Sequence, residues 1–191
     1  CFPATVCISI NEEIVHGIPS PHRRFKEGDI VGFDLGCIVE GYYGDCAFTL
    51  AIGEVPAKVQ QLLDVTRESL DLAIGECRVD RRLSDVSHAV QRHVEAHGFG
   101  VVRAFVGHGI GRALHEEPQV PNFGEPGRGP KLRPGMVLAI EPMVTMGSYE
   151  VKVLEDGWTA VTCDGSLAAH FEHTIAITEG APEVLTRRGA A

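Results

Sequence analysis

The chain has 191 residues, of which 44% are hydrophobic and 23% are charged, a balance typical of a soluble globular protein of one domain. Its formal net charge of −9 argues against binding nucleic acid through the overall electrostatic field. No stretch is long and apolar enough to suggest a membrane span, and no signal peptide opens the chain. We therefore expect a single domain over residues 1–191, in a cytoplasmic protein whose six cysteines stay reduced.

The start of the chain is unusual. It begins at Cys1 without a methionine and runs at once into a strand-like segment, Thr5 to Ile10. A domain rarely starts inside its own sheet, so we expect an N-terminal segment to be missing from this sequence.

The residue pattern predicts alternating strands and helices. The elements are a strand at 4–10, a Pro- and Gly-punctuated loop at 11–21, a hairpin at 29–52 with its turn near Glu40-Gly41, a helix from Pro56 to a turn at Gly75, a second helix from a Ser84 cap to His97, a strand at 101–106, loops around His108 and from Pro118 to Pro134, and a second hairpin at roughly 136–178. The helices are predicted because apolar residues recur there at helical spacing. This order favours an α+β, or two-layer α/β, domain with a curved and mostly antiparallel sheet.

Two acidic residues stand out in the first predicted hairpin. Asp45 follows Asp34 by eleven residues, and a turn between them would place the two carboxylates opposite each other on neighbouring strands. Like charges in such positions repel, and no lysine or arginine lies in this hairpin to neutralise them. A bound metal ion is the simplest explanation for two facing anions on apolar strands.

The far half of the chain repeats this arrangement. A glycine precedes Asp34 by six residues, and another precedes Glu141 by the same six; a glycine follows Asp45 by eight residues, and another follows Glu172 by the same eight. Two hairpins with acids at matching offsets predict an internal duplication whose halves face each other across one site. The alternative is a chance coincidence of four acids on solvated strands, which we consider the weaker interpretation.

Two of the nine histidines lie in segments typical of functional sites. His108 lies in Gly107-His-Gly-Ile-Gly111, where three glycines allow close turns of the backbone, and His115 follows seven residues later. A flexible loop with incidental histidines is the alternative. Six others are interpreted as helix residues (His88, His93, His97), as solvated (His22), or, for His170 and His173, as residues that contact the metal ligands or support the fold, because strand alternation would turn them away from the face of Glu172.

Five blocks of the sequence resemble the type I methionine aminopeptidases, in the family's order and over essentially the whole chain. The blocks are Asn11-Glu-Glu-Ile-Val-His16-Gly-Ile-Pro, Asp34…Asp45, Gly107-His-Gly-Ile-Gly-Arg-Ala-Leu-His-Glu-Glu-Pro-Gln-Val-Pro-Asn122, Ala139-Ile-Glu-Pro142 and Phe171-Glu-His-Thr-Ile175. The resemblance implies the pita-bread fold, in which two duplicated αβ halves enclose a dinuclear metal site. It also implies that the missing segment is the family's N-terminal helical portion.

The same resemblance implies roles for the five candidate metal ligands. Asp34 would chelate one ion and His108 the other, and Glu141 would complete the set of ligands around the ion that His108 binds. Asp45 and Glu172 would bridge the two ions. Such a carboxylate-rich set with one nitrogen donor suits Co, Mn or Fe as well as Zn, and the sequence does not choose among them.

The resemblance further implies a mechanism and a substrate pocket. A water shared by the two ions would attack the first peptide bond, with Glu141 as general base. His115 and His16 would hydrogen-bond the substrate's carbonyl oxygen or scissile nitrogen and stabilise the tetrahedral intermediate. The pocket for the methionine side chain would be lined by Phe2, Cys7, Leu114 and Trp158. Core packing is the alternative interpretation of Trp158.

The implied function is removal of the N-terminal methionine from nascent chains when the next residue is small. We expect a monomer near the ribosome, without membrane contact or direct nucleic-acid recognition; the basic residues Arg23, Arg24 and Lys26 could face the ribosome or form a solvated turn. Two alternatives remain open. A Pro-specific aminopeptidase or prolidase of the same fold would share the five ligands, and a non-catalytic pita-bread module would act only by binding.

Overall fold

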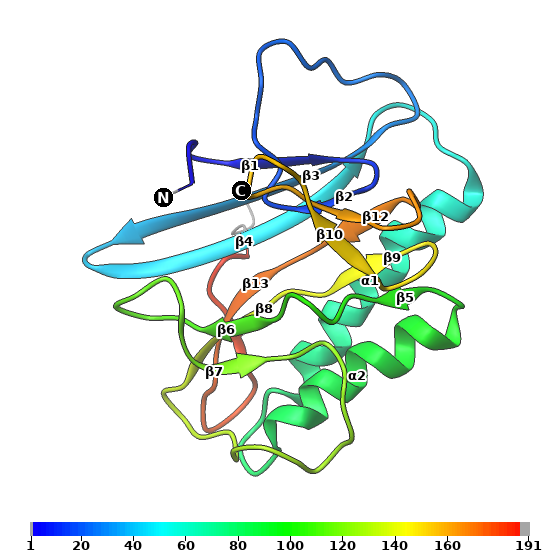
Figure 1. The fold of residues 1–191 in the computed structure, drawn as a ribbon. Helices are drawn as coiled ribbons and strands as arrows, with labels where there is room; N and C mark the ends of the chain where they lie inside the picture. Colours follow the sequence, from blue (N-terminus) through cyan, green and yellow to red (C-terminus); the bar gives the residue numbers. More distant parts are fainter. Residues whose placement is uncertain (1, 188–191) are drawn as a thin grey trace.

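The computed structural model describes residues 2–187, which form short strands and two helices (Figure 1). The elements are β1 (Cys7–Ile10), β2 (Glu13–Val15), β3 (Ile30–Val39), β4 (Tyr42–Ala51), α1 (Ala57–Glu76), α2 (Leu83–Ala96), β5 (Gly100–Val101), β6 (Gly107–Gly109), β7 (Glu116–Val120), β8 (Val137–Ile140), β9 (Met143–Thr145), β10 (Val151–Val153), β11 (Ala160–Thr162), β12 (Ala168–His170), β13 (His173–Ala176) and β14 (Glu183–Val184). The strands are ordered β1-β3-β4, β10-β11-β2, β12-β9-β5 and β14-β13-β8-β6-β7 in four sheets. Every strand pair in the described part is antiparallel, as the sequence predicts.

The first hairpin consists of β3 and β4, joined by the predicted turn at Glu40-Gly41. Both turn residues have positive φ, 52° and 83°, as a two-residue hairpin turn requires. The register differs from the expected one, because Asp34 lies opposite Ala47 and Asp45 lies opposite Gly36. The two carboxylates are therefore diagonal neighbours on one face of the hairpin, not directly opposed residues.

The second hairpin pairs β8 with β13, and it is not continuous over 136–178. Strands β9 to β12 lie between its two arms in the sequence and form their own pairs. In the β8–β13 register His173 faces Ile140, so Glu141 and Glu172 stand next to each other just beyond the last pair. The duplicated acids thus come from two hairpins whose registers differ by two residues.

The two hairpins meet where β4 touches the start of β13. Ala47 and Glu172 form an isolated antiparallel bridge, in which the Glu172 N–H donates to the Ala47 carbonyl at 2.8 Å. This bridge joins the two sheets that carry the acids into one curved surface, which continues from β1 to β7. The acidic residues of both halves therefore gather at a single junction.

Two buried threonines fasten this junction in the same way on either side of the bridge. The Thr174 hydroxyl accepts the Asp45 N–H at 2.9 Å and donates to the Asp45 carbonyl at 2.8 Å. The Thr49 hydroxyl accepts the His170 N–H at 3.0 Å and donates to the His170 carbonyl at 2.9 Å. Each hydroxyl takes the place of one pair of hydrogen bonds between strands. The backbone N–H and C=O of Asp45 and of His170 are therefore satisfied on the side where no strand pairs with them.

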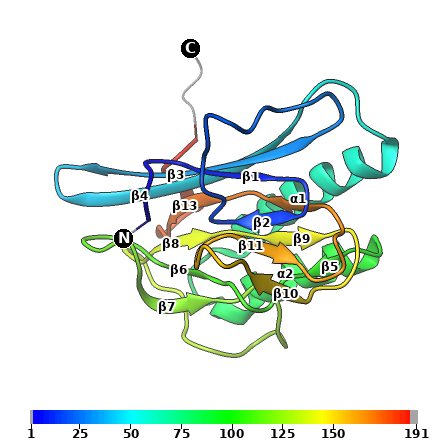
Figure 2. The same cartoon turned by 45° about the horizontal axis from the view of Figure 1, so that its top comes forward.

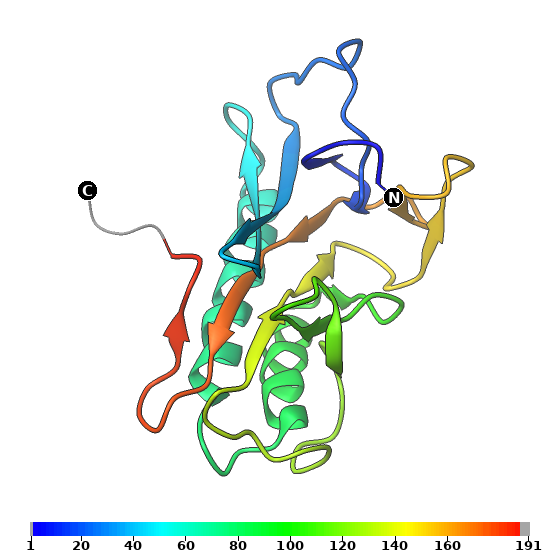
Figure 3. The same ribbon diagram turned by 90° about the vertical axis from the view of Figure 1, so that its left-hand side faces the viewer.

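The helices lie together on one side of the sheets (Figures 2 and 3). Helix α1 packs against α2 and against β4, β8, β9 and β12. The contact between α1 and α2 is apolar. Leu62 and Ala73 of α1 and Val86 and Val94 of α2 are fully buried. The helices thus cover one face of the sheets.

Both predicted helices are present, but Gly75 lies inside α1 and not in a turn beyond it, and α2 starts differently from the prediction. The helix begins at Leu83, and the Asp85 carboxylate accepts the Arg82 backbone N–H at 2.8 Å. The predicted Ser84 cap is wrong, because that hydroxyl donates to the Arg128 carbonyl instead, at 3.0 Å. The predicted stop is present, since Gly98 follows the helix with φ of 76°.

Three segments differ from the predicted elements. The loop at 11–21 contains β2, which pairs with the distant β11; His108 lies on β6 and not in a loop; and the strand expected at 101–106 is shortened to β5. These short strands depend on partners far along the chain, so local residue patterns do not reveal them.

Two composition-based expectations concern cysteines and membranes. Cys7, Cys37, Cys46, Cys77 and Cys163 are free thiols, and Cys1 lies outside the described residues. Neither helix found between residues 2 and 187 is both long and apolar enough to cross a bilayer.

The Thr174→Val substitution should destabilise the metal-free protein by about 1–3 kcal/mol, because the buried N–H and C=O of Asp45 lose their partner. Urea unfolding measures this loss. The control is Thr162→Val, which removes a buried hydroxyl that donates to Ser166 at 2.7 Å in another part of the fold. Both variants should lose stability, but only Thr174→Val should also bind divalent ions more weakly. Equal ion affinity in the two variants would contradict a role of Thr174 in holding Asp45.

Candidate active site

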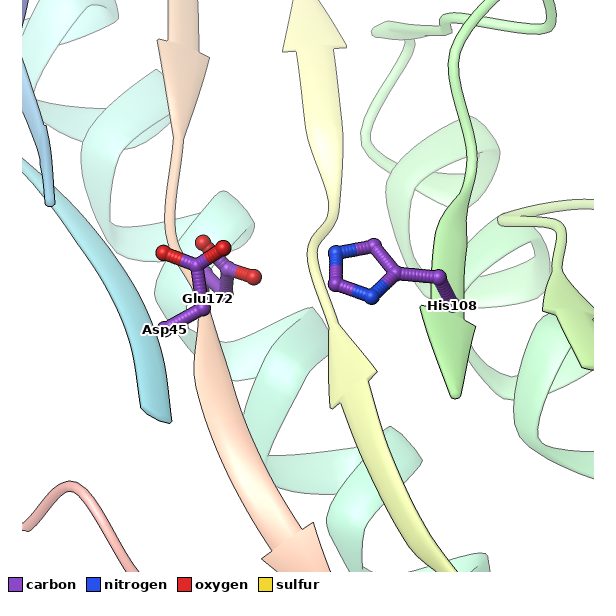
Figure 4. Close-up of side chains that lie close together, drawn as sticks. All are labelled: Asp45, His108 and Glu172. Atoms are coloured by element: carbon purple, nitrogen blue, oxygen red, sulfur yellow. The ribbon is translucent and has the colours of Figure 1, made fainter. Parts of the chain in front are cut away.

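Three of the predicted metal ligands converge in the structure. Asp45 on β4, His108 on β6 and Glu172 at the start of β13 each offer one donor atom, and these atoms lie within 4.8 Å of one another (Figure 4). All three are buried, with exposed fractions of 9%, 7% and 2%. Figure 4 shows the two carboxylates side by side, with the imidazole of His108 pointing toward them from β6.

The His108 ring is oriented by its own backbone neighbour. Its Nδ1 lies 2.9 Å from the Gly109 carbonyl oxygen, which can only accept, so Nδ1 carries the hydrogen. The other nitrogen, Nε2, therefore presents its lone pair toward the acids and lies 3.7 Å from Glu141 Oε1. A neutral imidazole held in this tautomer is the form that binds a metal ion.

The glycines beside His108 serve close packing within the sheet. A Cβ on Gly107 would collide with the Ala139 carbonyl, and one on Gly109 would collide with the Glu117 carbonyl. Neither glycine has a positive φ, so the expectation of close turns is corrected to close approach of strands β8 and β7.

Glu141 stands next to the three converging ligands. Its carboxylate is only 14% exposed, and its backbone carbonyl accepts the Asn122 side-chain amide at 2.9 Å. Asn122 is itself 1% exposed and follows directly on β7. This hydrogen bond holds the backbone of Glu141 in place just after β8. The sequence alone did not indicate this role for Asn122.

Asp34 lies farther out. It sits on β3 opposite Cys7, is half-buried, and lines a cleft together with Asp45. It is not one of the three residues whose donor atoms converge within 4.8 Å. Its charge nevertheless acts on that group, because it is among the causes that raise the pKa of both Asp45 and Glu172.

The acids destabilise one another in the absence of a cation. Burial, followed by the charges of Asp34 and Glu141, raises the pKa of Asp45 to about 6. Burial and the neighbouring charge of Glu141 also raise the pKa of Glu172 well above its usual range. The Glu172 Oε1 atom has no hydrogen-bond partner, and no lysine or arginine in residues 2–187 forms an ion pair with these acids. The residues present therefore fit a divalent cation.

His170 contacts a predicted ligand, but it lies on the strand face of Glu172 and not on the opposite face that was predicted. It is 4% exposed, and its Nε2 lies 3.4 Å from Glu141 Oε2. Burial opposes protonation, but the adjacent Glu141 carboxylate raises the pKa of His170 overall. Strand alternation turns His173 away from the acids, whereas His170 is two residues from Glu172 and lies on the same side. Correct use of the two-residue period would have found it.

A cleft of about 650 Å³ opens beside the acids. It is lined by all the predicted substrate-binding residues and by two of the acids: Phe2, Cys7, His16, Asp34, Asp45, Leu114, His115 and Trp158. The rings of Phe2 and Trp158 meet edge to face, with centroids 5.4 Å apart. Trp158 is half-buried and faces the cleft, so core packing is excluded as its role. Burial and then Asp34 raise the pKa of the Cys7 thiol to about 12, so it forms a neutral wall.

His16 is held in a strained conformation at the back of the cleft. Its φ of 60° is rare for a residue with a side chain. The next residue must be Gly17, because a Cβ there would collide with the Ile8 carbonyl. The His16 imidazole stands edge-on to the rings of Phe105 and Trp158, with ring centroids 5.7 and 6.4 Å apart. Burial lowers the pKa of His16. The sequence does not mark Phe105 as a site residue, because its contact with His16 joins segments that lie far apart in the chain.

His115 also lines the cleft, next to His108. It is exposed, and its ring meets that of His108 edge to face with centroids 4.4 Å apart. Partial burial and then the neighbouring His108 lower its pKa. Both His16 and His115 thus line the cleft with pKa values lowered from the ordinary value of histidine.

Comparison with known proteins agrees with this geometry. A family model described as metallopeptidase family M24 matches residues 1–179. The methionine aminopeptidase of Clostridium acetobutylicum is 56% identical over 185 residues, which cover 97% of this chain and 74% of that protein. The chain belongs to the methionine aminopeptidases of metallopeptidase family M24. The crystal structure of methionine aminopeptidase from Thermotoga maritima aligns with a TM-score of 0.94 and 56% identity, and covers 96% of this chain and 74% of that one.

The family resemblance and the pita-bread fold predicted from the sequence are thereby confirmed. A prolidase from Pyrococcus horikoshii shares the fold with a TM-score of 0.77, but it is only 23% identical and is covered over 48% of its length. That likeness shows the fold alone. Membership in a metallopeptidase family, together with the converging Asp45, His108 and Glu172, supports the use of a divalent metal ion.

The Asp45→Asn substitution should stabilise the metal-free protein at neutral pH by about 1–3 kcal/mol. The folded-state pKa of about 6 lies above the ordinary 3.8, so ionised Asp45 costs stability, and this cost appears as pH rises through that window. The variant cannot ionise and lacks the cost. Urea unfolding with a chelator, at pH 4 and at pH 7, measures the difference. A difference of the same size at both pH values would contradict the assignment.

Proposed function

We propose that this protein removes the N-terminal methionine from polypeptides whose next residue is small. The observation that carries the proposal is the convergence of buried acids and His108 at the inner end of an apolar cleft. An exopeptidase needs a site that binds a chain terminus and activates water beside it. The relatives named methionine aminopeptidase, at 56% and 53% identity, support methionine as the terminal residue.

The proposed metal centre holds two divalent ions, of Co, Mn, Fe or Zn. We assign Asp34 to one ion, His108 and Glu141 to the other, and Asp45 and Glu172 as bridges. Two ions held in this way would supply a water of lowered pKa and would polarise the substrate carbonyl. The donor set of four carboxylates and one imidazole supports this assignment, as does the unpartnered Glu172 oxygen.

The chain's own residues would move the proton and steady the reacting atoms. Glu141 is the proposed general base, and its position between His108 and His170 supports this role. His16 and His115 both line the cleft beside the acids, where each ring can donate one hydrogen bond to a carbonyl oxygen or accept one from the scissile nitrogen.

The apolar end of the cleft would receive the methionine side chain. Phe2 and Trp158 provide an edge-to-face aromatic wall, and the protonated Cys7 and Leu114 complete it. An unbranched thioether adapts to such a wall and makes favourable contacts with aromatic rings.

We also propose where this protein works and in which oligomeric state. A nascent-chain substrate implies a cytoplasmic protein that works near the ribosome, as a monomer of one catalytic domain. In the basic cluster Arg23 is paired with Glu13 at 2.8 Å, whereas Arg24 and Lys26 are exposed. A solvated turn remains the simpler interpretation of that cluster.

Hydrolysis of Met-Ala-Ser against peptides containing Gly-Pro tests the proposal, with each divalent ion added back to chelator-treated protein. Release of methionine from Met-Ala-Ser, dependent on the added ion, is the expected result. Cleavage of the Pro peptides alone would support the prolidase alternative. Ion binding without any cleavage would support a binding module.

Replacing His115 with alanine should lower kcat about a hundredfold and change KM little, because the lost hydrogen bond acts mainly in the transition state. Steady-state kinetics on Met-Ala-Ser measures both constants. His22, an exposed histidine distant from the acids, provides the control substitution His22→Ala. Turnover of the His115→Ala protein equal to that of the control would reject this role for His115.

A further inference from the structure

The outer half of β3 has an unpaired edge that runs out of the cleft. Strand β1 pairs with β3 only as far as Asp34, whereas β4 pairs with it as far as Val39. No strand of residues 2–187 pairs with Leu35–Val39 on the side where β1 ends. Figure 1 shows the β3–β4 hairpin extending past β1 on the left.

The register shows which backbone groups face this edge. The N–H groups of Tyr43 and Asp45 donate to acceptors outside the hairpin, at 2.8 and 2.9 Å, so both residues point away from β3. Their partners Ile38 and Gly36 must then turn their N–H and C=O groups away from β4, because two residues directly opposite in an antiparallel pair either bond to each other or both turn away from each other. Two N–H groups and two carbonyls thus face the open side.

The edge is continuous with the proposed active site. Leu35, Gly36 and Ile38 line the same cleft as Asp34 and Asp45. Gly36 has no side chain to block the way, and a Cβ placed there would lie 3.5 Å from Asp45 Oδ1. A chain whose N-terminus lies at the acids can therefore leave the site along this edge.

The edge is also apolar and firmly held. Ile38 and Val39 are 58% and 66% exposed, and residues 35–39 contain no lysine or proline of the kind that usually protects an edge strand. The hairpin tip is fixed by Arg112, whose guanidinium lies 4.7 Å from the Tyr42 ring centroid and donates to the Tyr42 hydroxyl at 3.0 Å. A held, unprotected edge is suited to pairing with another extended chain.

We propose that the substrate polypeptide, beyond the bond that is cut, binds this edge as an added strand parallel to β3. Its contacts are backbone hydrogen bonds to Gly36 and Ile38. The direction follows from the geometry, since β3 runs outward from Asp34 and a substrate whose N-terminus lies at the acids also runs outward. Backbone pairing would accept many different downstream sequences. This inference rests on the proposed function.

Peptide length and backbone methylation test the proposal on the metal-loaded protein. A hexapeptide beginning Met-Ala-Ser should have a kcat/KM about tenfold above that of Met-Ala-Ser, as expected for two added hydrogen bonds. Single N-methylations are then placed at its third to sixth residues. Every second position should lose several-fold in kcat/KM and the positions between should not, because a strand turns alternate N–H groups toward its partner.

A substitution on the protein side tests the same contact. Ile38→Pro removes an N–H that the β3–β4 ladder does not use, and proline is tolerated at such an edge. It should reduce the ratio of hexapeptide to tripeptide kcat/KM. The matched variant Ile38→Ala keeps the N–H and should keep the ratio, whatever its effect on the absolute rates.

The outcomes separate this proposal from the function on which it rests. Cleavage of Met-Ala-Ser with no gain from length, or equal sensitivity at all methylated positions, would overturn the added strand and leave the proposed function standing. An equal loss of the length ratio in both Ile38 variants would assign the effect to the side chain and reject backbone pairing. No cleavage of any peptide would overturn both.

Discussion

The junction between β4 and β13 is the contact on which the rest of the site depends. The Ala47–Glu172 bridge sets the distance between the two hairpins, and the hydroxyls of Thr174 and Thr49 hold Asp45 and His170 on either side of it. Without this junction, each hairpin would carry its acids on an isolated ribbon. With it, donor atoms from three separate strands come within 4.8 Å of one another.

The same junction explains why the metal-free protein stores unfavourable energy there. Carboxylates are brought together in a buried place where no lysine or arginine of the described residues neutralises them, and the pKa of Asp45 rises to about 6 as a result. The surrounding fold compensates through well-buried apolar contacts, such as those between α1 and α2. Local instability of this kind is common where a site is shaped for a ligand and not for the empty protein.

Much of this architecture could be predicted from the sequence, and the failures have physical causes. The two hairpins and their acids can be predicted because strand alternation and turn residues are local features of the sequence. The internal repeat supports the same prediction. The register of Asp34 and Asp45 could not be predicted, because the spacing of two acids in the sequence does not determine which residues a turn places opposite each other. Asn122 and Phe105 act through contacts between distant strands. The position of His170 could have been predicted, since the two-residue period of a strand places it beside Glu172.

The junction joins residues that lie far apart in the chain. Asp45 and Thr174, which clamp one another, are 129 residues apart in the chain. A growing polypeptide therefore carries Asp45 long before it carries the threonine and the glutamate that complete the site. Contacts of such long range form late, because the loop between them must close first. The site can therefore assemble only after Glu172 and Thr174 have been made, and a shortened chain that ends before Glu172 has no means of assembling it.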